Sequence, residues 1–355
     1  MATEEQVRGS LDGILVPGAM RSLTRMNLIR GVAVSDHKVK VSLASTALWD
    51  GALEWVKSKV EEVMKGLPDV SEVETEFIEA KSAELNEVKH VVAVMSGKGG
   101  VGKSLVAGLL ALSLARQGLE AGILDGDITG PSIPRMFGMT VRPTGSDSGI
   151  MPVSTKTGIE MMSMNLFLPN EDDAVIWRGP LIGKAITQFW EEVLWGKLDY
   201  LIVDLPPGTA DAPLTVLQSL PVSGVVIVFS PQELAAMVVR KAVQMCQEMK
   251  IPMIGVVENM SYLVLPDTGK RFEVFGKSRA EEMAKAAGAP LLAQLPIDPE
   301  LAKLCDDGDL EQYNSPLIAS LGKAFVEAAS ERGRQPQKKS GQEAERHGSS
   351  CHNAE

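Results

Sequence analysis

Two lysines lie five positions apart in the glycine-rich stretch MSGKGGVGKS, residues 95–104. From Gly97 onward the stretch fits the pattern G-x-x-x-x-G-K-[ST], whose backbone N–H groups cradle phosphate oxygens. In that pattern Lys103 neutralises the β- and γ-phosphates of a nucleotide, and the Ser104 hydroxyl holds Mg²⁺. The pattern needs only one lysine, so it does not account for Lys98.

The segments on either side of this loop have the character that a phosphate loop requires. The run HVVAVMS at residues 90–96 is apolar and rich in β-branched side chains, which favours a buried strand. The run after the loop favours a helix that ends at Gly118. The loop therefore precedes a helix N-terminus, where the dipole favours anions. The predicted nucleotide-binding residues of the loop are Gly97, Lys98, Gly99, Gly100, Val101, Gly102, Lys103 and Ser104.

Carboxylates follow two further apolar runs. Asp125 and Asp127 end the stretch GILDGD, and Asp204 ends the run LDYLIVD. A carboxylate at the end of a strand beside a phosphate loop is well placed to hold Mg²⁺, directly or through water. We therefore expect Ser104, Asp125 and Asp204 to form the Mg²⁺ site, and Asp127 to orient the attacking water. The alternative is that Asp125 and Asp127 only cap the strand and the turn after it.

Strand-like runs alternate with helical stretches from about residue 88 to 330. Near-continuous Val, Ile and Leu runs predict an α/β fold with a mainly parallel sheet covered by helices on both faces. In such sheets ligands bind at the carboxyl ends of the strands, where the polar motif residues fall here. The predicted strands lie at residues 90–96, 122–127, 198–208, 223–231, 252–260 and 291–298.

The first 84 residues have a pattern of their own, with two strands around a polar turn, an amphipathic helix and a third strand. This pattern predicts a small α+β domain at residues 1–84, joined by the charged linker KSAELNEVK to a P-loop ATPase domain at 85–330. Residues 331–355 contain almost no apolar side chains, and we expect them to form a disordered tail.

Charge and hydropathy limit the classes of partner. The net charge of −11 argues against binding to nucleic acid or anionic lipid, because both repel an acidic surface. No apolar run approaches the roughly 20 residues of a membrane span. The N-terminus MATEEQVRGS is polar and acidic, unlike an export signal. We expect a cytoplasmic protein with neither nucleic acid nor membrane among its partners.

Five motifs together closely resemble the Mrp (ApbC-type) iron–sulfur cluster carrier ATPases, relatives of MinD and ParA. They are KGGVGKS, LDGDITGPSIPRMFG, WRGPLIGKAITQF, DYLIVDLPPGTAD and ENMSY. The resemblance covers about residues 88–330, and residues 1–84 resemble the small iron–sulfur-assembly domain that often precedes this ATPase. It implies ATP and Mg²⁺ as cofactors, an iron–sulfur cluster, a homodimer, and apo-protein recipients or assembly proteins as partners.

The resemblance also gives roles to single residues. In this class of loop the first lysine reaches across a homodimer interface to the partner's nucleotide, so Lys98 is expected to act in trans on the charge of the transferring phosphoryl group. The predicted catalytic residues are then Lys98, Lys103 and Asp127. Asn259 of ENM is expected to hydrogen-bond the adenine, with a turn residue as the alternative. Arg178 is expected to be a structural or interface residue near the nucleotide.

The sequence departs from the family where the cluster ligands belong. In Mrp proteins ENMSY is typically followed by a C-x-x-C pair, whereas Leu265 and Thr268 stand at those positions here. Neither side chain supplies the thiolates that hold iron–sulfur clusters. The stretch LASTALWDGALEW likewise has no cysteine where relatives often carry one. No iron–sulfur ligand is therefore identified.

The three cysteines of the chain form no C-x-x-C pair. Cys246 lies in a helical stretch and is expected to pack as a small buried side chain. Cys305 precedes a predicted helix end. Cys351 and His352 are adjacent in the tail, where metal binding is the less favoured alternative.

These observations lead to one function and two alternatives. The function is an ATP-binding and ATP-hydrolysing iron–sulfur cluster carrier or assembly factor that works as a homodimer. The first alternative is a cluster-free, nucleotide-switched interaction ATPase. The second is a MinD- or ParA-like positioning ATPase, which is less favoured because SPLIASLGKAFVEAASERGR is typical of a last core helix, not of a basic membrane-binding one.

Overall fold

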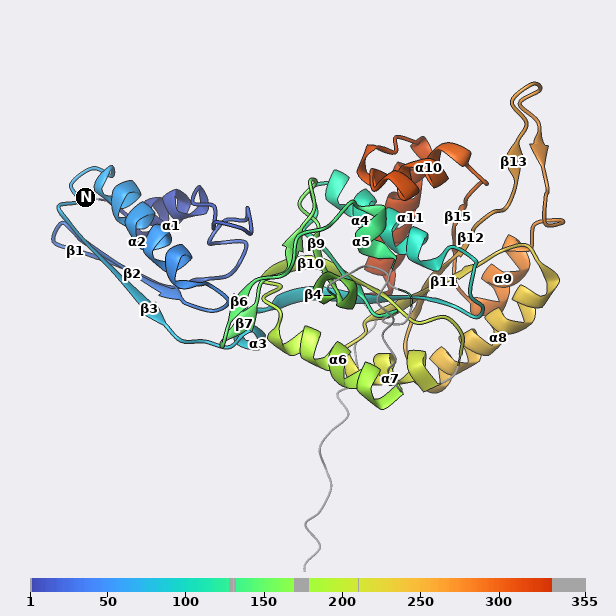
Figure 1. Cartoon of the computed structure of the whole chain (residues 1–355), viewed down its shortest axis with the longest axis horizontal. Coiled ribbons are helices and arrows are strands. Elements are labelled where there is room, and N and C mark those ends of the chain that lie inside the picture. Colours follow the sequence, from blue (N-terminus) through green and yellow to red (C-terminus); the bar gives the residue numbers. More distant parts are fainter. Residues whose placement is uncertain (1, 128–129, 131, 169–178, 210, 334–355) are drawn as a thin grey trace, which may run out of the picture.

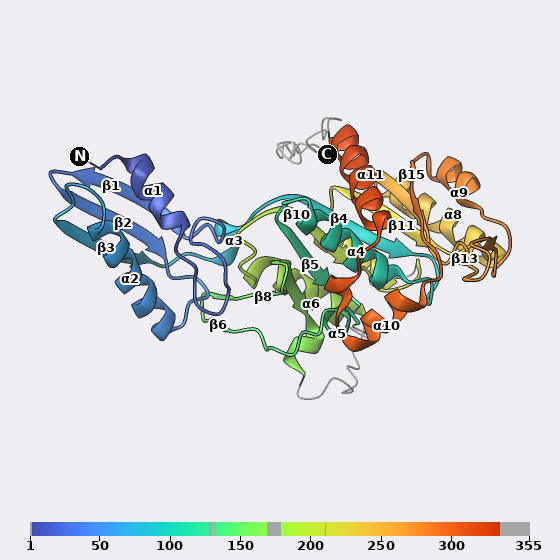
Figure 2. The ribbon, with the colours of Figure 1, turned by 90° about the horizontal axis from the view of Figure 1, so that it is seen from above.

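The computed structural model describes residues 2–127, 130, 132–168, 179–209 and 211–333. The chain forms a small sheet near its N-terminus and a large sheet in the remainder (Figure 1). The same figure shows a hairpin, β13–β14, that projects at the end of the molecule farthest from the small sheet. Seen from above, the small sheet lies to one side of the large one (Figure 2).

The N-terminal unit packs two helices against one face of a three-stranded sheet. Strand β1 pairs antiparallel with β2, and β2 pairs parallel with β3. Alternate residues of β2, Val39, Val41 and Leu43, are fully buried beneath the helices. The predicted hairpin, helix and third strand are confirmed, whereas the first helix was not predicted. The elements are α1 (Glu4–Asp12), β1 (Ile29–Ser35), β2 (Lys38–Ala44), α2 (Asp50–Lys65) and β3 (Glu72–Ile78).

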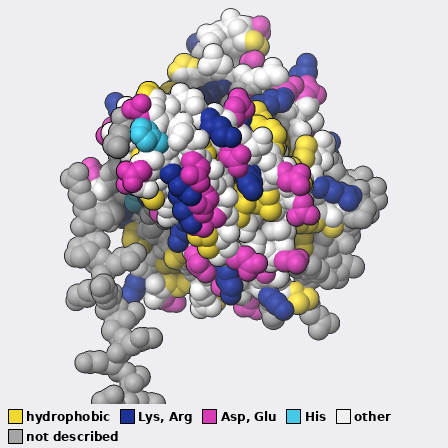
Figure 3. All heavy atoms as spheres, turned by 90° about the vertical axis from the view of Figure 1, so that its left-hand side faces the viewer, with side chains coloured by type: hydrophobic (Ala, Val, Ile, Leu, Met, Phe, Trp, Pro, Cys, Tyr) yellow, Lys and Arg dark blue, Asp and Glu magenta, His cyan; other side chains and the backbone are white. Residues whose placement is uncertain are grey.

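The other face of this sheet is charged. Lys38 bridges Glu72 and Glu74, and Lys40 bridges Glu74 and Glu76, at distances of 2.7 to 3.1 Å. Figure 3 shows positive and negative side chains side by side on this end of the molecule. Exposed pairs of this kind contribute at most about 1 kcal/mol each, so the ladder keeps the face solvated rather than holding the fold together.

The segment KSAELNEVK is packed, not an exposed linker. It contains the short helix α3 (Ser82–Leu85), whose first and last side chains are buried. The Ser82 hydroxyl donates to the Glu192 carbonyl at 2.7 Å, and the Asn86 amide donates to the Val193 carbonyl at 2.9 Å. The connection between the two sheets is therefore held by specific hydrogen bonds.

The core of the N-terminal unit extends into the rest of the chain. Met151 and Leu194, from outside the first 84 residues, are buried in its apolar cluster. Arg21 is 5% exposed, and its guanidinium donates to the carbonyls of Trp195 at 3.0 Å and Lys197 at 3.2 Å. The turn around residues 194–197 is thus enclosed by the N-terminal unit.

The large sheet has eight strands in the order β15-β12-β11-β4-β10-β5-β9-β8. All neighbours are parallel except β8 and β9, which confirms the predicted mainly parallel sheet. Each predicted strand is present, whereas the strands of the 145–163 region were not predicted. The strands are β4 (Glu87–Ser96), β5 (Ala121–Asp125), β8 (Val153–Ser154), β9 (Glu160–Ser163), β10 (Lys197–Asp204), β11 (Gly224–Phe229), β12 (Met253–Glu258) and β15 (Leu291–Gln294).

Helices cover both faces of the large sheet (Figure 1). On the central strand β4, Val92 and Val94 pack against α4 and α11, while Ala93 and Met95 pack against the helices of the other face. The helices are α4 (Lys103–Arg116), α5 (Ile133–Met136), α6 (Gly179–Glu192), α7 (Asp211–Ser219), α8 (Glu233–Glu248), α9 (Ala280–Ala287), α10 (Pro299–Asp307) and α11 (Pro316–Gly333).

Short elements complete the described chain. They are β6 (Gly145–Ser146), β7 (Gly149–Ile150), β13 (Leu263–Val264), β14 (Arg271–Phe272) and the 3-10 turns η1 (Met164–Phe167) and η2 (Leu310–Gln312). Helix α11 buries Leu321 and Phe325 completely, which confirms it as a core helix, and it continues to Gly333. No helix in the described ranges has the length and apolarity to cross a membrane.

Candidate functional site

The glycine-rich loop connects the end of β4 to the start of α4. Gly100 and Gly102 have φ values of +80° and +79°, a region that costs other residues about 1 kcal/mol or more. A Cβ at Gly102 would lie 2.2 Å from Nδ2 of Asn259, and one at Gly97 would lie 2.3 Å from Val238. Glycine is therefore required at 97 and 102 by close approach, and at 100 by backbone conformation.

Lys103, Ser104 and Asp204 meet behind the loop. Lys103 Nζ lies 2.5 Å from Asp204 Oδ1, and the Ser104 hydroxyl donates to Asp204 Oδ2 at 2.6 Å. Lys103 is 6% exposed and Asp204 is fully buried at the end of β10. The strand end, the loop and the first turn of α4 thus bring a cation, a hydroxyl and a carboxylate to one point.

Asp125 ends β5 and is paired in register with Asp204 on the neighbouring strand β10. It is also fully buried, and the Ser163 hydroxyl donates to its Oδ2 at 3.1 Å. Burial raises the pKa of Asp125, and the charge of Asp204 raises it further. Burial likewise raises the pKa of Asp204, although Lys103 opposes this. Two buried carboxylates share one buried lysine, an arrangement that favours a further cation.

Asp127 and Lys98 lie outside this buried group. The backbone N–H of Asp127 donates to Asp125 Oδ1 at 3.2 Å, so its position is tied to the end of β5. Lys98 is exposed, and its backbone carbonyl accepts from the Ser96 hydroxyl at 3.0 Å. The side chain of Lys98 is therefore at the surface of the loop while its backbone is fixed.

Asn259 makes a contact that sequence reasoning missed. It follows β12, is 3% exposed, and donates from Nδ2 to the Val101 carbonyl inside the loop at 2.9 Å. The residues are far apart in the chain, so no local pattern signals this contact. Asn259 supports the loop that carries Lys103, and the predicted hydrogen bond to adenine remains a separate prediction.

The positions of the missing cysteines lie on the projecting hairpin. Leu265 and Thr268 are in the turn between β13 and β14, where the Leu265 N–H donates to the Lys270 carbonyl at 2.9 Å. Cys246 is fully buried, as predicted, with its thiol 3.5 Å from the Met95 sulfur. Burial raises the pKa of the Cys246 thiol to about 11.

Cys305 lies near the C-terminal end of α10, where the sequence predicted a helix end, and it is partly buried. Burial and the neighbouring Asp306 raise its pKa to about 11. Neither Cys246 nor Cys305 is thus disposed to form a thiolate. No group of three or more His, Cys, Asp and Glu side chains suited to a metal ion occurs among the described residues. Arg178, Cys351 and His352 lie outside the described residues.

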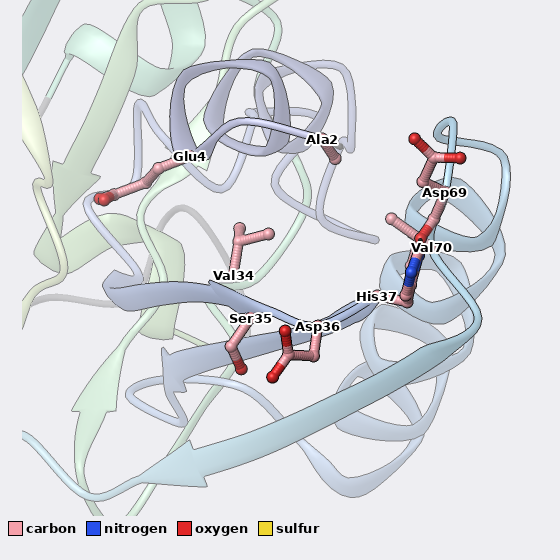
Figure 4. A pocket seen from close by; sticks show the side chains of 8 residues that line it. All are labelled: Ala2, Glu4, Val34, Ser35, Asp36, His37, Asp69 and Val70. Carbon is pink, nitrogen blue, oxygen red and sulfur yellow. Dashed lines mark hydrogen bonds between the residues drawn. The ribbon is translucent and has the colours of Figure 1, made fainter.

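A separate hollow of about 250 Å³ lies in the N-terminal unit beside the β1–β2 turn (Figure 4). Two of its lining residues are joined by a hydrogen bond, in which the His37 Nδ1–H donates to the Asp69 carbonyl at 2.7 Å. Figure 4 shows the Glu4 side chain on the opposite side of the hollow from His37. These polar groups face solvent. The lining residues are Ala2, Glu4, Val34, Ser35, Asp36, His37, Asp69 and Val70.

A glycine loop between a central parallel strand and a helix, with a lysine, a hydroxyl and strand-end carboxylates behind it, defines a P-loop nucleotide-binding protein. The family described as NUBPL iron-transfer P-loop NTPases matches residues 87–330, and an iron–sulfur cluster assembly protein family matches residues 4–75. The chain belongs to the NUBPL iron-transfer P-loop NTPases.

Relatives extend over most of the chain. An iron–sulfur cluster carrier protein of Synechocystis is 39% identical over 321 residues, covering 87% of this chain and 91% of the relative. One of Aquifex aeolicus is 37% identical over 307 residues, covering 79% of this chain and 84% of the relative. Among solved structures, a nucleotide-binding protein of Archaeoglobus fulgidus in complex with ADP is 45% identical, with a TM-score of 0.59. This match covers 65% of this chain and 91% of the chain in that structure.

Proposed function

We propose that this protein binds and hydrolyses ATP and acts as an iron–sulfur cluster carrier or assembly factor. The observation that carries the proposal is the group of Lys103, Ser104 and Asp204 behind the glycine loop. Relatives that are named iron–sulfur cluster carriers and match 79% and 87% of this chain support the proposal that the cargo is an iron–sulfur cluster. Recipient apo-proteins or assembly proteins are the proposed partners, with no nucleic acid and no membrane, and the cytoplasm is the proposed location.

The loop residues have separate roles in the proposed nucleotide site. Backbone N–H groups from Gly97 to Gly102 would surround the phosphates, and Lys103 would turn from Asp204 toward the β- and γ-phosphates. Such a turn would release the Asp204 carboxylate. Without nucleotide, Lys103 neutralises the buried carboxylates. When the lysine turns to the phosphates, the Mg²⁺ that accompanies the nucleotide would take its place as their counter-charge.

The donor set behind the loop fits Mg²⁺. The Ser104 hydroxyl and the carboxylates of Asp204 and Asp125 are hard oxygen donors, the kind that Mg²⁺ prefers. Bound there, the ion would neutralise charge on the phosphate oxygens. Ser163 would keep Asp125 oriented toward the ion through its hydrogen bond to Oδ2.

Hydrolysis is proposed to need a second copy of the chain. Lys98 is exposed on the loop, which is consistent with a role on the nucleotide of a partner subunit in a homodimer. Asp127, tied to Asp125 through its backbone, is the proposed group that orients the attacking water. Asn259, beside the loop, is the proposed contact to the adenine, in addition to its bond to Val101.

Three alanine variants test these roles. Lys103→Ala should weaken ATP binding by about 10- to 100-fold, because a charge-assisted hydrogen bond of about 1.5–3 kcal/mol is lost. Lys98→Ala and Asp127→Ala should still bind ATP and release phosphate slowly. Lys323→Ala, which changes an exposed lysine on α11, is the control. Nucleotide titration and phosphate release are measured for each variant. Normal turnover of Lys98→Ala would refute its role in trans.

The carrier function depends on ligands that hold the cluster. A cluster needs several thiolates, and Leu265 and Thr268 stand where relatives of the Mrp type carry a pair. We propose that the protein holds a cluster only weakly or transiently. The cluster-free, nucleotide-switched interaction ATPase is the second candidate, and the buried state of Cys246 favours it.

Reconstitution with iron and sulfide under anaerobic conditions distinguishes the cluster carrier from the cluster-free interaction ATPase. The wild-type protein should retain little cluster, and the pair Leu265→Cys with Thr268→Cys should retain more, because both positions lie in one exposed turn. Iron and sulfide analysis with the visible absorption spectrum measures retention. A stable, stoichiometric cluster on the wild-type protein would refute weak ligation and would direct attention to the three native cysteines.

A further inference from the structure

Glu258 is a buried carboxylate that the nucleotide site does not use. It is the last residue of β12 and is fully buried. Its Oε2 accepts from the hydroxyls of Ser261 at 2.5 Å and Ser278 at 2.7 Å, and from the Gln294 amide at 3.0 Å. Its Oε1 accepts from the backbone N–H of Arg279 at 2.7 Å. Four donors converge on one side chain.

Two of these donors mark the two ends of the projecting hairpin. The chain leaves the domain after Ser261 and returns at Ser278, and residues 262–277 between them carry β13 and β14 (Figure 1). Most of this hairpin is exposed, including Val264 at 47% and Phe272 at 55%. The carboxylate of Glu258 thus joins both ends of a projecting, partly apolar hairpin.

The next residue holds the phosphate loop. Asn259 donates to the Val101 carbonyl, and its Nδ2 lies 2.2 Å from the place that a Cβ of Gly102 would occupy. Its own backbone N–H donates to the Phe229 carbonyl at 2.8 Å, which fixes it to strand β11. Adjacent residues of an extended chain point in opposite directions. Glu258 accordingly bonds to the hairpin ends while Asn259 bonds to the loop.

This arrangement joins two distant structures through two consecutive residues. A fully satisfied, buried polar network adopts discrete arrangements, because breaking any bond leaves a buried group without a partner at a cost of about 1–3 kcal/mol. A movement of the loop that also displaces the backbone of Asn259 would shift Glu258 or break its bonds. Either change reaches both ends of the hairpin.

We propose that Glu258 is a positioning residue that transmits the nucleotide state of the phosphate loop to the hairpin at residues 262–277. The proposal rests on the nucleotide binding proposed above. The exposed apolar side chains of the hairpin would be reoriented or ordered when nucleotide binds. Coupling of this kind is carried by a two-state element that both sites bias.

Hydrogen exchange of the full chain, with and without a non-hydrolysable ATP analogue and Mg²⁺, tests the proposal. Peptides covering residues 262–277 of the wild-type protein should change exchange rate by about fivefold or more on nucleotide addition. In Glu258→Gln, which replaces an acceptor oxygen by a donor, the nucleotide-dependent change should fall below about twofold. The control Glu273→Gln changes an exposed glutamate of the same hairpin and should behave like the wild type.

A merely structural role gives a different result. If Glu258 only holds the fold, its loss raises exchange in the hairpin equally with and without nucleotide, the nucleotide-dependent difference survives, and the proposal is overturned. Ser278→Ala removes a single donor and keeps the measurement open if Glu258→Gln does not fold. It should reduce the difference partly, and an undiminished difference would overturn the proposal as well.

Direct nucleotide titration separates this proposal from the proposed function. A wild-type protein that binds no nucleotide refutes the nucleotide site itself, and the coupling with it. A wild-type protein that binds nucleotide while the exchange of residues 262–277 stays unchanged refutes the coupling alone. The same titration of Glu258→Gln checks that the variant still binds nucleotide, so that a smaller change in hydrogen exchange is not caused by loss of binding.

Discussion

Glu160 carries a buried carboxyl group at the junction between the N-terminal unit and the large sheet. It lies on β9 and is 1% exposed, with Oε1 3.4 Å from Nε of Arg21 and 2.9 Å from the Ser154 hydroxyl. Burial raises the pKa of Glu160 from 4.5 to about 7, although Arg21 and Ser154 oppose the rise. Replacement by glutamine keeps the shape and removes the titration. Arg21 keeps the carbonyls of Trp195 and Lys197 as acceptors.

The size of the effect follows from the raised pKa. The difference between 4.5 and about 7 corresponds to about 3 kcal/mol of unfolding free energy. Because the folded pKa is the higher one, the stabilisation is complete below pH 4.5 and is lost as the pH rises through about 7. Between about pH 5.5 and about pH 8.5 the wild-type protein should lose about 2 kcal/mol that Glu160→Gln does not lose.

Urea unfolding of both proteins at these two pH values measures the difference. The free energy of the wild type minus that of Glu160→Gln should fall by about 2 kcal/mol from the lower to the higher pH. Taking this difference cancels the titration of groups that both proteins share. Glu54→Gln, an exposed change on α2, should show almost no such fall. A difference that stays constant with pH would refute the assignment of a raised pKa to Glu160.

Two further predictions concern the loop and the cysteines. Gly102→Ala should weaken nucleotide binding about fivefold or more beyond Gly100→Ala in a fluorescence titration. Both glycines have φ near +80°, but of the two only position 102 would bring a Cβ against Asn259. Displacing Asn259 breaks its buried hydrogen bond to the loop, at a cost of about 1–3 kcal/mol. Equal losses of affinity in the two variants would contradict this reasoning. Iodoacetamide should label Cys305 faster than Cys246 in the native protein, because Cys246 is fully buried. Peptide mass spectrometry measures the labelling of the two cysteines. Faster labelling of Cys246 would contradict this expectation and would show that helix α8 opens locally.

The sequence predicted the elements that depend on patterns within short stretches of the chain. The run before the loop, the glycine spacing and the apolar run ending at Asp204 were enough to predict a strand, a phosphate loop and a strand-end carboxylate. These features depend on residues close together in the chain, where periodicity and turn chemistry act. The prediction that Cys246 packs as an apolar side chain has the same local basis.

Contacts between distant segments were not predictable in this way. The bond from Asn259 to Val101 joins β12 to the loop, and the contact of Arg21 with Trp195 joins the two sheets. Neither partner carries a local signal of the other. The segment around Ser82 was predicted as a linker because it is charged, yet the charged side chains point outward while Ser82 itself is buried against the end of α6. A polar composition predicts that most side chains of a segment are exposed, but it does not predict that the backbone of the segment is mobile.

The burial of Leu194 by the N-terminal unit affects whether that unit can be lost in evolution or removed by truncation. Leu194 and Met151 are buried in an apolar cluster whose other members come from residues 7–85, and the carbonyls of Trp195 and Lys197 accept from Arg21. An ancestor without the N-terminal unit would need other cover for these two apolar groups and other donors for these carbonyls. The two parts of the chain are therefore not interchangeable modules on a tether, and gain or loss of the first part requires matching changes at residues 151 and 194–197.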